Sequence, residues 1–369
     1  MEKDAVSPMD APRNDIPERD REPRFDERSA HEPWEPASPA EVGLDPEALR
    51  RAHEDIAAHY PKMYAFLVAR DGKLVYERYY GGADAEARFD LRSATKSFTA
   101  AAVMLAEAQG ALGDEATLGA LFPGETPRTA TPELLATTVG QLLTMTSGLH
   151  WQTGHRLGER WIHRFHRAKH WVRFALRLPV NAETRGAFQY RSVDSHLLSA
   201  AVSRAAGRSA ADVVGEALFA PLGVAAPSWA ADPQGVTAGH IGLALTGRDL
   251  AKFGWLHATG GLWEGRRLLP PEAVRRALTP QTDGLPAFGA YGRHWWIARE
   301  ASGGVVRCAL GHGGQLVFVA PEARLVAVFA ASPKVSRWKH PLRLLERHVL
   351  PAVRGDGLAA SAPARGDSR

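Results

Sequence analysis

Cysteine is almost absent from this chain: Cys308 is the single thiol among 369 residues. One thiol cannot form an internal disulfide, and it cannot build a zinc site from several thiolates. Because its neighbours are apolar, we expect Cys308 to be a small buried side chain rather than a reactive thiol. An uninterrupted apolar run of about 20 residues, the length that crosses a bilayer, is also missing. The sequence therefore predicts no stable membrane insertion.

The first 41 residues lack the apolar run of an export signal and are dense in Asp, Glu, Arg and Pro, so we expect a cytoplasmic protein. Residues 1–41 and the small-residue tail 353–369 have too little apolar surface to offset their ordering entropy, and both are predicted to be disordered. The formal net charge of +4 comes from arginines spread along the chain rather than from a basic stripe. Nucleic-acid binding is therefore not expected.

Strand patterns lie near both ends of the chain. Two β-branched and aromatic runs between Met63 and Tyr80 flank Asp71-Gly72, a pair typical of a tight hairpin. Strand patterns return late in the chain, at 291–298, 304–310, 315–319 and 325–331, and a closing helix is predicted from Pro341.

Helical spacing dominates the middle of the chain, where the predicted helices are 97–109, 139–145, 161–178, 193–206 and 247–258. Together these patterns predict an α+β fold. An antiparallel sheet is built from both chain ends, 42–92 and 255–352, and is flanked by helices. A mainly helical subdomain, 93–254, is inserted between the two parts of the sheet.

The junction from strand to helix carries Ser93-Ala94-Thr95-Lys96. Residues three apart share a face in the first turn of a helix, so the Lys96 amine can reach the Ser93 hydroxyl. A serine hydroxyl is a weak nucleophile until a neighbouring base takes its proton, and a lysine whose pKa is lowered by burial can be that base. The helix N-terminus also favours an oxyanion beside Ser93.

The spacing alone is weak, because Ser336-Arg337-Trp338-Lys339 repeats it. There His340-Pro341 follows, and a residue before proline avoids helical geometry, so we assign this copy to a surface loop. For Ser93 taken alone, an ordinary helix start is the competing interpretation.

Two further segments strengthen the case: Phe188-Gln189-Tyr190-Arg191-Ser192 precedes helical spacing, and Leu310-Gly311-His312-Gly313-Gly314-Gln315 precedes a strand. With Ser93 and Lys96 they resemble the serine β-lactamase-like superfamily of class C β-lactamases, penicillin-binding peptidases, esterases and 6-aminohexanoate-oligomer hydrolases. Its signatures are Ser-x-x-Lys, Tyr-x-Asn or Tyr-x-Ser, and Lys-Thr-Gly or His-x-Gly. The stretches 142–149 and 242–254 also look like the family.

The resemblance implies that Ser93 attacks a carbonyl and that Lys96 helps to deprotonate it. It implies that Tyr190 carries the proton to the leaving group and then activates water. Ser192 takes the place of the family's Asn or Ser and could hydrogen-bond Lys96 or substrate.

The third motif is implied to bind substrate. The backbone N–H groups of Ser93 and Gln315 would form the oxyanion hole, and Gly313 and Gly314 would let substrate approach the strand closely. His312-Gly313-Gly314 replaces the Lys-Thr-Gly of many relatives, which removes a fixed cation that commonly holds a substrate carboxylate. His312 could replace that charge only when protonated.

We therefore predict a serine hydrolase that acts on a small ester or linear amide through an acyl-enzyme on Ser93. A true β-lactamase or DD-peptidase is the alternative in the same chemical class. A non-catalytic binding module on the same fold is the alternative from another class. No cofactor is implied, and the oligomeric state is open.

A basic segment, 156–177, contains His163, His166 and His170 at helical spacing. Intervening arginine and lysine side chains would repel a cation, so we expect no metal there. Interleaved aromatic residues could touch an anionic membrane, but we favour a helix with an apolar inner face and a solvated basic face.

Overall fold

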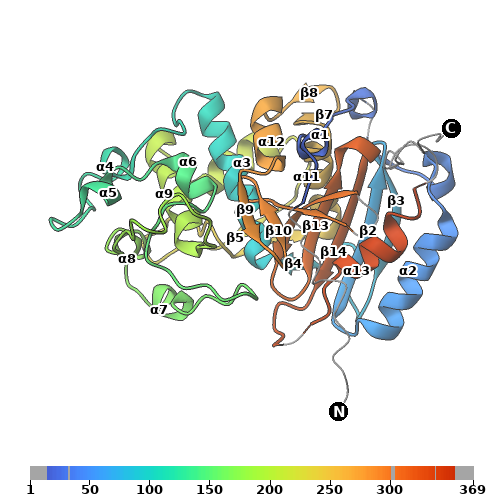
Figure 1. The fold of residues 1–369 in the computed structure, drawn as a ribbon. Coiled ribbons are helices and arrows are strands. Elements are labelled where there is room, and N and C mark those ends of the chain that lie inside the picture. Colours follow the sequence, from blue (N-terminus) through green and yellow to red (C-terminus); the bar gives the residue numbers. More distant parts are fainter. Residues whose placement is uncertain (1–14, 32–33, 301–303, 337, 354–369) are drawn as a thin grey trace, which may run out of the picture.

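One nine-stranded sheet forms the centre of the protein (Figure 1). The computed structural model describes residues 15–31, 34–300, 304–336 and 338–353. The strands lie in the order β1 (Glu35–Pro36), β3 (Lys73–Tyr79), β2 (Met63–Arg70), β14 (Leu325–Ala331), β13 (Gln315–Ala320), β12 (Val305–Gly311), β11 (Trp296–Arg299), β10 (Gly289–Tyr291) and β9 (Thr282–Leu285). Every neighbouring pair is antiparallel except β1 and β3, which are parallel. Because β2 pairs directly with β14, the sheet is built from both chain ends, and the predicted α+β fold is confirmed.

Helices cover both faces of this sheet, as the alternation of side chains along β2 requires. Phe66 and Val68 belong to the core under α2 (Pro46–His59) and the C-terminal helix, which comprises α13 (Leu342–Leu344) and a π-helical turn (Leu345–Val349). Leu67 and Ala69 belong to the core on the opposite face, under α11 (Gly247–Ala258). At the turn between β2 and β3, Asp71 and Gly72 both have positive φ, 52° and 75°, which confirms the predicted tight hairpin.

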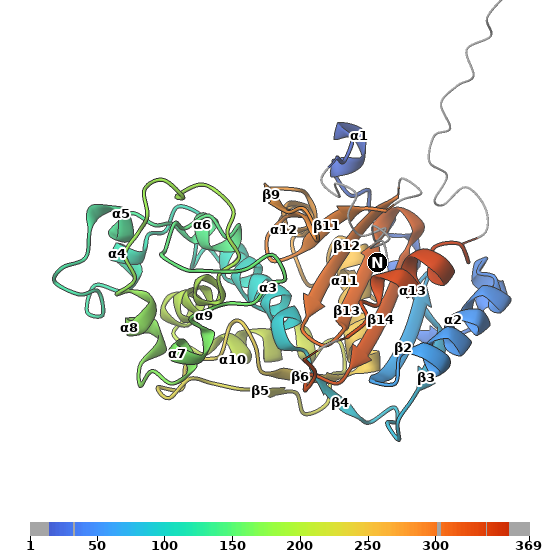
Figure 2. The ribbon, with the colours of Figure 1, turned by 60° about the horizontal axis from the view of Figure 1, so that its bottom comes forward.

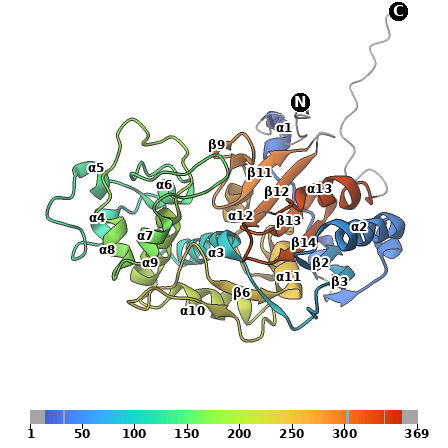
Figure 3. The same cartoon turned by 90° about the horizontal axis from the view of Figure 1, so that it is seen from below.

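The helical part of the chain lies beside one end of the sheet (Figure 3). Its helices are α3 (Thr95–Ala108), α4 (Leu118–Leu121), α5 (Pro132–Leu135), α6 (Val139–Leu143), α7 (Ile162–His166), α8 (Trp171–Ala175), α9 (Ser192–Ala206) and α10 (Ala210–Val214) with a π-helical turn (Gly215–Phe219). The helix predicted over 161–178 is in fact α7 and α8, because His170 between them has extended backbone.

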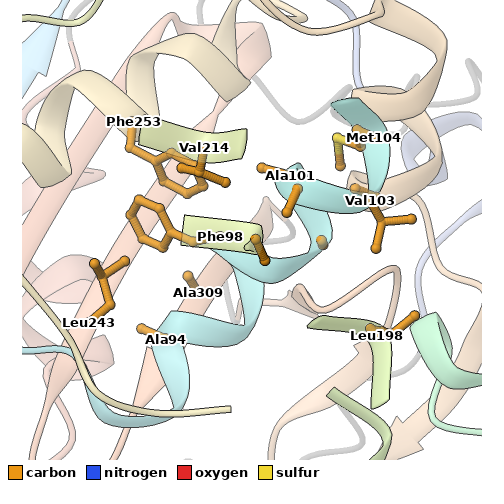
Figure 4. Packing of buried hydrophobic residues seen from close by; sticks show 14 of the residues in the cluster. Ala94, Phe98, Ala101, Val103, Met104, Leu198, Val214, Leu243, Phe253 and Ala309 are labelled. Atoms are coloured by element: carbon orange, nitrogen blue, oxygen red, sulfur yellow. The ribbon is translucent and has the colours of Figure 1, made fainter. Parts of the chain in front are cut away.

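Helix α3 joins the helical part to the sheet. Phe98 stacks on Phe253 of α11 with ring centroids 3.6 Å apart, and it lies close to Val214 of α10 (Figure 4). Further along α3, Val103 lies on the side of the helix toward Leu198 of α9 (Figure 4), and both belong to the same core as Met104.

Helix α11 belongs to the sheet layer rather than to the helical part. A Cβ built on Gly254 would lie 2.6 Å from Val326 Cγ1 of β14 and 3.0 Å from Val317 Cγ1 of β13. The boundary that we expected between residues 254 and 255 therefore falls inside α11. The remaining elements are α12 (Pro271–Leu278), the two-stranded β7 (Leu262–Trp263) and β8 (Arg266–Arg267), and a three-stranded sheet of β4 (Arg88–Asp90), β6 (Leu243–Thr246) and β5 (Ser228–Trp229).

The expected disorder of residues 1–41 is wrong for the part that the structure describes, 15–31 and 34–41. Ile16 and Ala30 are buried, and β1 pairs with β3. The buried guanidinium of Arg307 donates to the Asp20 carbonyl. Polar contacts therefore hold this segment to the sheet although it has few apolar residues. Residues 1–14 lie outside the described residues, as does the predicted disordered tail apart from Val353, which bridges to Leu44. Among the described helices, none is both long and apolar enough to cross a membrane.

We predict that Gly254→Ala lowers the free energy of unfolding by about 1 to 3 kcal/mol, the usual cost of forcing volume into a packed interior. Urea unfolding measures this change. The control is Gly215→Ala, because a Cβ on that helical glycine has nothing within 4 Å and should cost nothing. Equal unfolding midpoints for the two variants would contradict close packing of α11 on the sheet.

Candidate active site

Ser93 lies in a 3-10 turn, Arg92–Ala94, that connects β4 to α3. Strand β4 is held by β6, and both lie next to the start of α3 (Figure 2). Arg92 adopts φ 49°, a left-handed conformation that few residues other than glycine take, and its N–H donates to Asp90 Oδ1 at 2.9 Å. The turn leaves Ser93 partly exposed while the rest of the first turn of α3 is buried.

The amine of Lys96 is surrounded by three oxygen atoms. Lys96 Nζ lies 3.1 Å from Ser93 Oγ, 3.2 Å from Ser192 Oγ and 3.3 Å from the carbonyl oxygen of His240. The ring centroid of Tyr190 is 4.7 Å from the same nitrogen. The structure therefore brings together Ser93, Lys96, Tyr190 and Ser192, the four side chains that the first two motifs predicted.

Burial controls the protonation of this group. Lys96 is only 1% exposed, and burial lowers the pKa of its ammonium from 10.5 to about 8; the positive charge of Arg92 acts in the same direction and Glu159 opposes it. Burial also raises the pKa of the Tyr190 phenol far above 10, and Glu159 adds to this effect while a hydrogen bond with Ser93 opposes it. Near neutral pH, Tyr190 is therefore an uncharged phenol, whereas a fraction of Lys96 is a free amine.

A buried arginine fixes the segment that carries Tyr190 and Ser192. Arg191 has no exposed surface, and its guanidinium donates to the carbonyls of Met145 at 2.9 Å and Leu149 at 2.8 Å. Ser147, which lies between Met145 and Leu149 in the sequence, donates its hydroxyl proton to the Asp194 carboxylate, with both oxygens at 2.9 Å. Burial raises the pKa of Asp194 to about 7. The family-like stretch 142–149 thus anchors the start of α9.

Two groups at the site were missed by sequence reasoning. Glu159, in the loop before α7, accepts hydrogen bonds from Ser192 and Trp151. His240 contributes its backbone carbonyl, because Thr99 Oγ1 donates to the neighbouring Gly239 carbonyl at 2.7 Å and holds that segment along α3. A backbone oxygen leaves no sequence signal, and the loop around Glu159 has no periodic pattern.

The hairpin between β12 and β13 carries the third motif. A Cβ built on Gly311 would lie 2.1 Å from the Leu91 carbonyl oxygen and 3.2 Å from the Ala94 nitrogen, so this strand end packs directly on the Ser93 turn. The Gln315 side chain exchanges hydrogen bonds with the backbone of Ala331, so both of its amide atoms already have partners within the fold. His312 is exposed, and its Nε2 lies 2.7 Å from the Val335 carbonyl oxygen.

The two glycines of this hairpin have a structural reason. Gly313 and Gly314 have φ of 90° and 107°, and a Cβ on Gly313 would lie 2.3 Å from the Ser332 carbonyl oxygen. Glycine is therefore needed at both positions for the positive φ of the turn, and at Gly313 also because the hairpin passes close to the residue that follows β14.

Other candidates from the sequence lie away from this group. Ser336 is exposed in the loop after β14, as predicted for the second Ser-x-x-Lys copy. His163 and His170 are exposed, whereas His166 Nε2 lies 2.8 Å from His240 Nε2. Among the described residues, no three histidine, cysteine or carboxylate side chains are arranged to hold a metal ion. Cys308 is buried in β12, as expected.

The basic segment forms two short amphipathic helices. Phe165 and Trp171 are buried, while Arg164 and Arg173 are exposed beside a surface hollow of about 690 Å³. The predicted apolar inner face and solvated basic face are confirmed.

A family model described as Beta-lactamase matches residues 54–346. The chain belongs to the beta-lactamase family. It is similar to a 6-aminohexanoate-dimer hydrolase of Paenarthrobacter ureafaciens, with 27% identity over 336 residues that cover 83% of this chain and 81% of the relative. Its fold resembles that of a Bacillus anthracis protein assigned as a 6-aminohexanoate-dimer hydrolase, with 20% identity and a TM-score of 0.66 over 92% of this chain and 89% of the other. A D-stereospecific amidohydrolase from Streptomyces sp. has 18% identity and a TM-score of 0.61 over 82% of this chain and 98% of the other.

Membership of the beta-lactamase family confirms the resemblance drawn from the three motifs and makes the chain a hydrolase. The motifs at Ser93, Tyr190 and Gln315 all lie within the matched residues.

We predict that Gly311→Ala lowers hydrolytic turnover on the order of 100-fold, because the added methyl must push the β12 end away from the Ser93 turn and small displacements of reacting groups are costly. The assay is p-nitrophenyl butyrate hydrolysis, with circular dichroism to check the fold. Gly113→Ala is the control, since its Cβ meets nothing within 4 Å. Unchanged turnover in the Gly311 variant would show that this contact does not shape the site.

Proposed function

We propose that this protein is a serine hydrolase that cleaves esters or linear amides through an acyl-enzyme on Ser93. The observation that carries the proposal is the 3.1 Å contact between Ser93 Oγ and the Nζ of a buried lysine whose pKa is about 8. Such a lysine is a free amine often enough near neutral pH to take the proton of the serine hydroxyl.

The first half of the reaction follows from this arrangement. Neutral Lys96 takes the Ser93 proton as Oγ bonds to the carbonyl carbon, and the backbone N–H groups of Ser93 and Gln315 would bind the oxyanion. The oxyanion then collapses, the bond to the leaving oxygen or nitrogen breaks, and that atom receives a proton. The Tyr190 phenol, close to both Ser93 and Lys96, would donate it and be reprotonated by the Lys96 ammonium.

The second half returns the enzyme to its starting state. Water replaces the leaving group, gives a proton to the base and attacks the acyl carbon. The acid is released, and Ser93 regains its proton. Because burial keeps Tyr190 uncharged, we assign the base to Lys96 and the relay to Tyr190.

Aromatic side chains near the site favour an uncharged acyl group. Trp296 stacks on Tyr190 with ring centroids 5.9 Å apart, and Phe288 follows Trp296 at 5.2 Å. His340 and Trp338 continue this row of rings to His312. The motif itself carries no lysine, because His312 stands in that position and its Nε2 lies 2.7 Å from the Val335 carbonyl oxygen. This supports esters and linear amides over β-lactams and peptide C-termini.

We predict a single covalent adduct when the protein is treated with a fluorophosphonate probe, and loss of the adduct in Ser93→Ala. Intact mass measures the adduct, and p-nitrophenyl butyrate turnover should fall by at least about 1000-fold in parallel. Ser336→Ala is the matched control, because this exposed serine has the same Ser-x-x-Lys spacing outside a helix. Rapid hydrolysis of a chromogenic cephalosporin would favour the β-lactamase alternative. No adduct and no turnover from folded protein would favour the binding module.

We predict that turnover rises with pH and levels off above about pH 8. The lowered pKa means that Lys96 carries its proton below about pH 8 and cannot accept another, and it becomes an active base as the pH rises through that value. The measurement is the pH profile of kcat/KM between pH 6 and 10. A profile that is flat across this range would exclude Lys96 as the base.

A further inference from the structure

Glu159 makes three hydrogen bonds at the edge of the site. It accepts from Ser192 Oγ at 2.6 Å, from the Ser192 backbone N–H at 2.7 Å and from Trp151 Nε1 at 2.7 Å. The two nitrogen donors both reach Oε1, and the hydroxyl reaches Oε2. An ionised carboxylate can only accept, so the single hydroxyl proton of Ser192 is committed to Glu159.

That commitment changes what Ser192 offers to Lys96. A hydroxyl that has given its proton away can only accept from another neighbour. Ser192 Oγ, 3.2 Å from Lys96 Nζ, is therefore an acceptor for the amine. The His240 carbonyl, 3.3 Å away, is an acceptor in any state.

Neutral lysine has two N–H bonds and one lone pair. Two of the three oxygen atoms around Lys96 Nζ can only accept, and they use both N–H bonds. The lone pair then faces the third oxygen, Ser93 Oγ, 3.1 Å away, whose hydroxyl has a proton to give. The direction of the lone pair is thus decided by which neighbours have a proton to offer.

We propose that Glu159 is a positioning residue that makes Ser192 an obligate acceptor and so directs the lone pair of neutral Lys96 toward the Ser93 hydroxyl. This role rests on the proposed function, in which Lys96 takes the Ser93 proton. Glu159 does not touch the reacting atoms; it acts through Ser192.

Glu159→Gln tests the proposal with little change in shape. The N–H groups of Ser192 and Trp151 hold the amide oxygen, which turns the amide nitrogen toward Ser192 Oγ. That nitrogen donates, so the Ser192 proton is free to point at Lys96 and to compete for its lone pair. We expect the high-pH plateau of kcat/KM to fall about 10- to 100-fold. Loss of the negative charge that supports the Lys96 ammonium should also move the rising limb to lower pH.

A second variant separates orientation from charge. Ser192→Ala removes the competing hydroxyl altogether, so its plateau should lie above that of Glu159→Gln. The double variant Ser192→Ala/Glu159→Gln has no Ser192 hydroxyl for the amide to reorient. Adding Glu159→Gln to Ser192→Ala should therefore not lower the high-pH plateau of kcat/KM any further, although the rising part of the pH profile should still move to lower pH. Glu183→Gln, an exposed glutamate in the same part of the chain, is the control for loss of one charge.

The outcomes distinguish this role from the proposed function. Fluorophosphonate labelling of every variant reports whether Ser93 is still reachable and the protein folded. If the wild type is not labelled at Ser93, the proposed function fails. If the wild type is labelled, two results would overturn the positioning role. One is that Glu159→Gln has the same kcat/KM plateau and the same rising part of the pH profile as Glu183→Gln. The other is that Glu159→Gln lowers the plateau equally in the presence and in the absence of the Ser192 hydroxyl.

Discussion

The burial of one ammonium group, that of Lys96, is the constraint on which the rest of the site depends. Moving an unpaired ammonium out of water costs several kcal/mol, so a buried lysine requires acceptors at close range. Here the acceptors come from three separate parts of the chain: the Ser93 turn, the start of α9 and the segment before β6. The same burial lowers the pKa of the amine to about 8, so a fraction of Lys96 is unprotonated near neutral pH, as the proposed function requires of a base.

The elements around Lys96 hold each other in place. Thr99 of α3 binds the Gly239 carbonyl, and Asp194 of α9 binds Ser147. The Cβ that Gly239 lacks would lie 2.1 Å from the Ser195 carbonyl oxygen, so α9 and the segment before β6 are also in direct contact. Polar contacts between rigid elements thus hold Ser93, Lys96 and Ser192 in place, and the proposed mechanism requires such preorganised groups.

The sequence predicted the elements that its local patterns describe. Runs of apolar, β-branched and aromatic residues located most strands at both ends, although the strand predicted over 291–298 is divided between β10 and β11. Asp71-Gly72 located the hairpin, and three spaced motifs located the Ser93, Tyr190 and Gln315 segments. The predicted division of the chain at residues 254 and 255 did not foresee a contact between residues distant in sequence. Helix α11 follows the helical part in sequence but packs on the sheet, because Gly254 has no side chain to keep it away from Val326 and Val317. The N-terminal segment looked disordered by composition, although a few contacts such as Arg307 with the Asp20 carbonyl hold it to the sheet.

Because β2 pairs with β14, the central sheet can be completed only late in the synthesis of the chain. Strand β2 has β3 as its early partner, but its other edge waits for residues that leave the ribosome more than two hundred positions later. Until then the Ser93 turn lacks the β12–β13 hairpin that packs on it, and the nascent chain carries an open sheet edge. The Ser93 turn is therefore made early in synthesis, but its contact with the β12–β13 hairpin can form only after most of the chain has been made, so partly made chains lack a complete site.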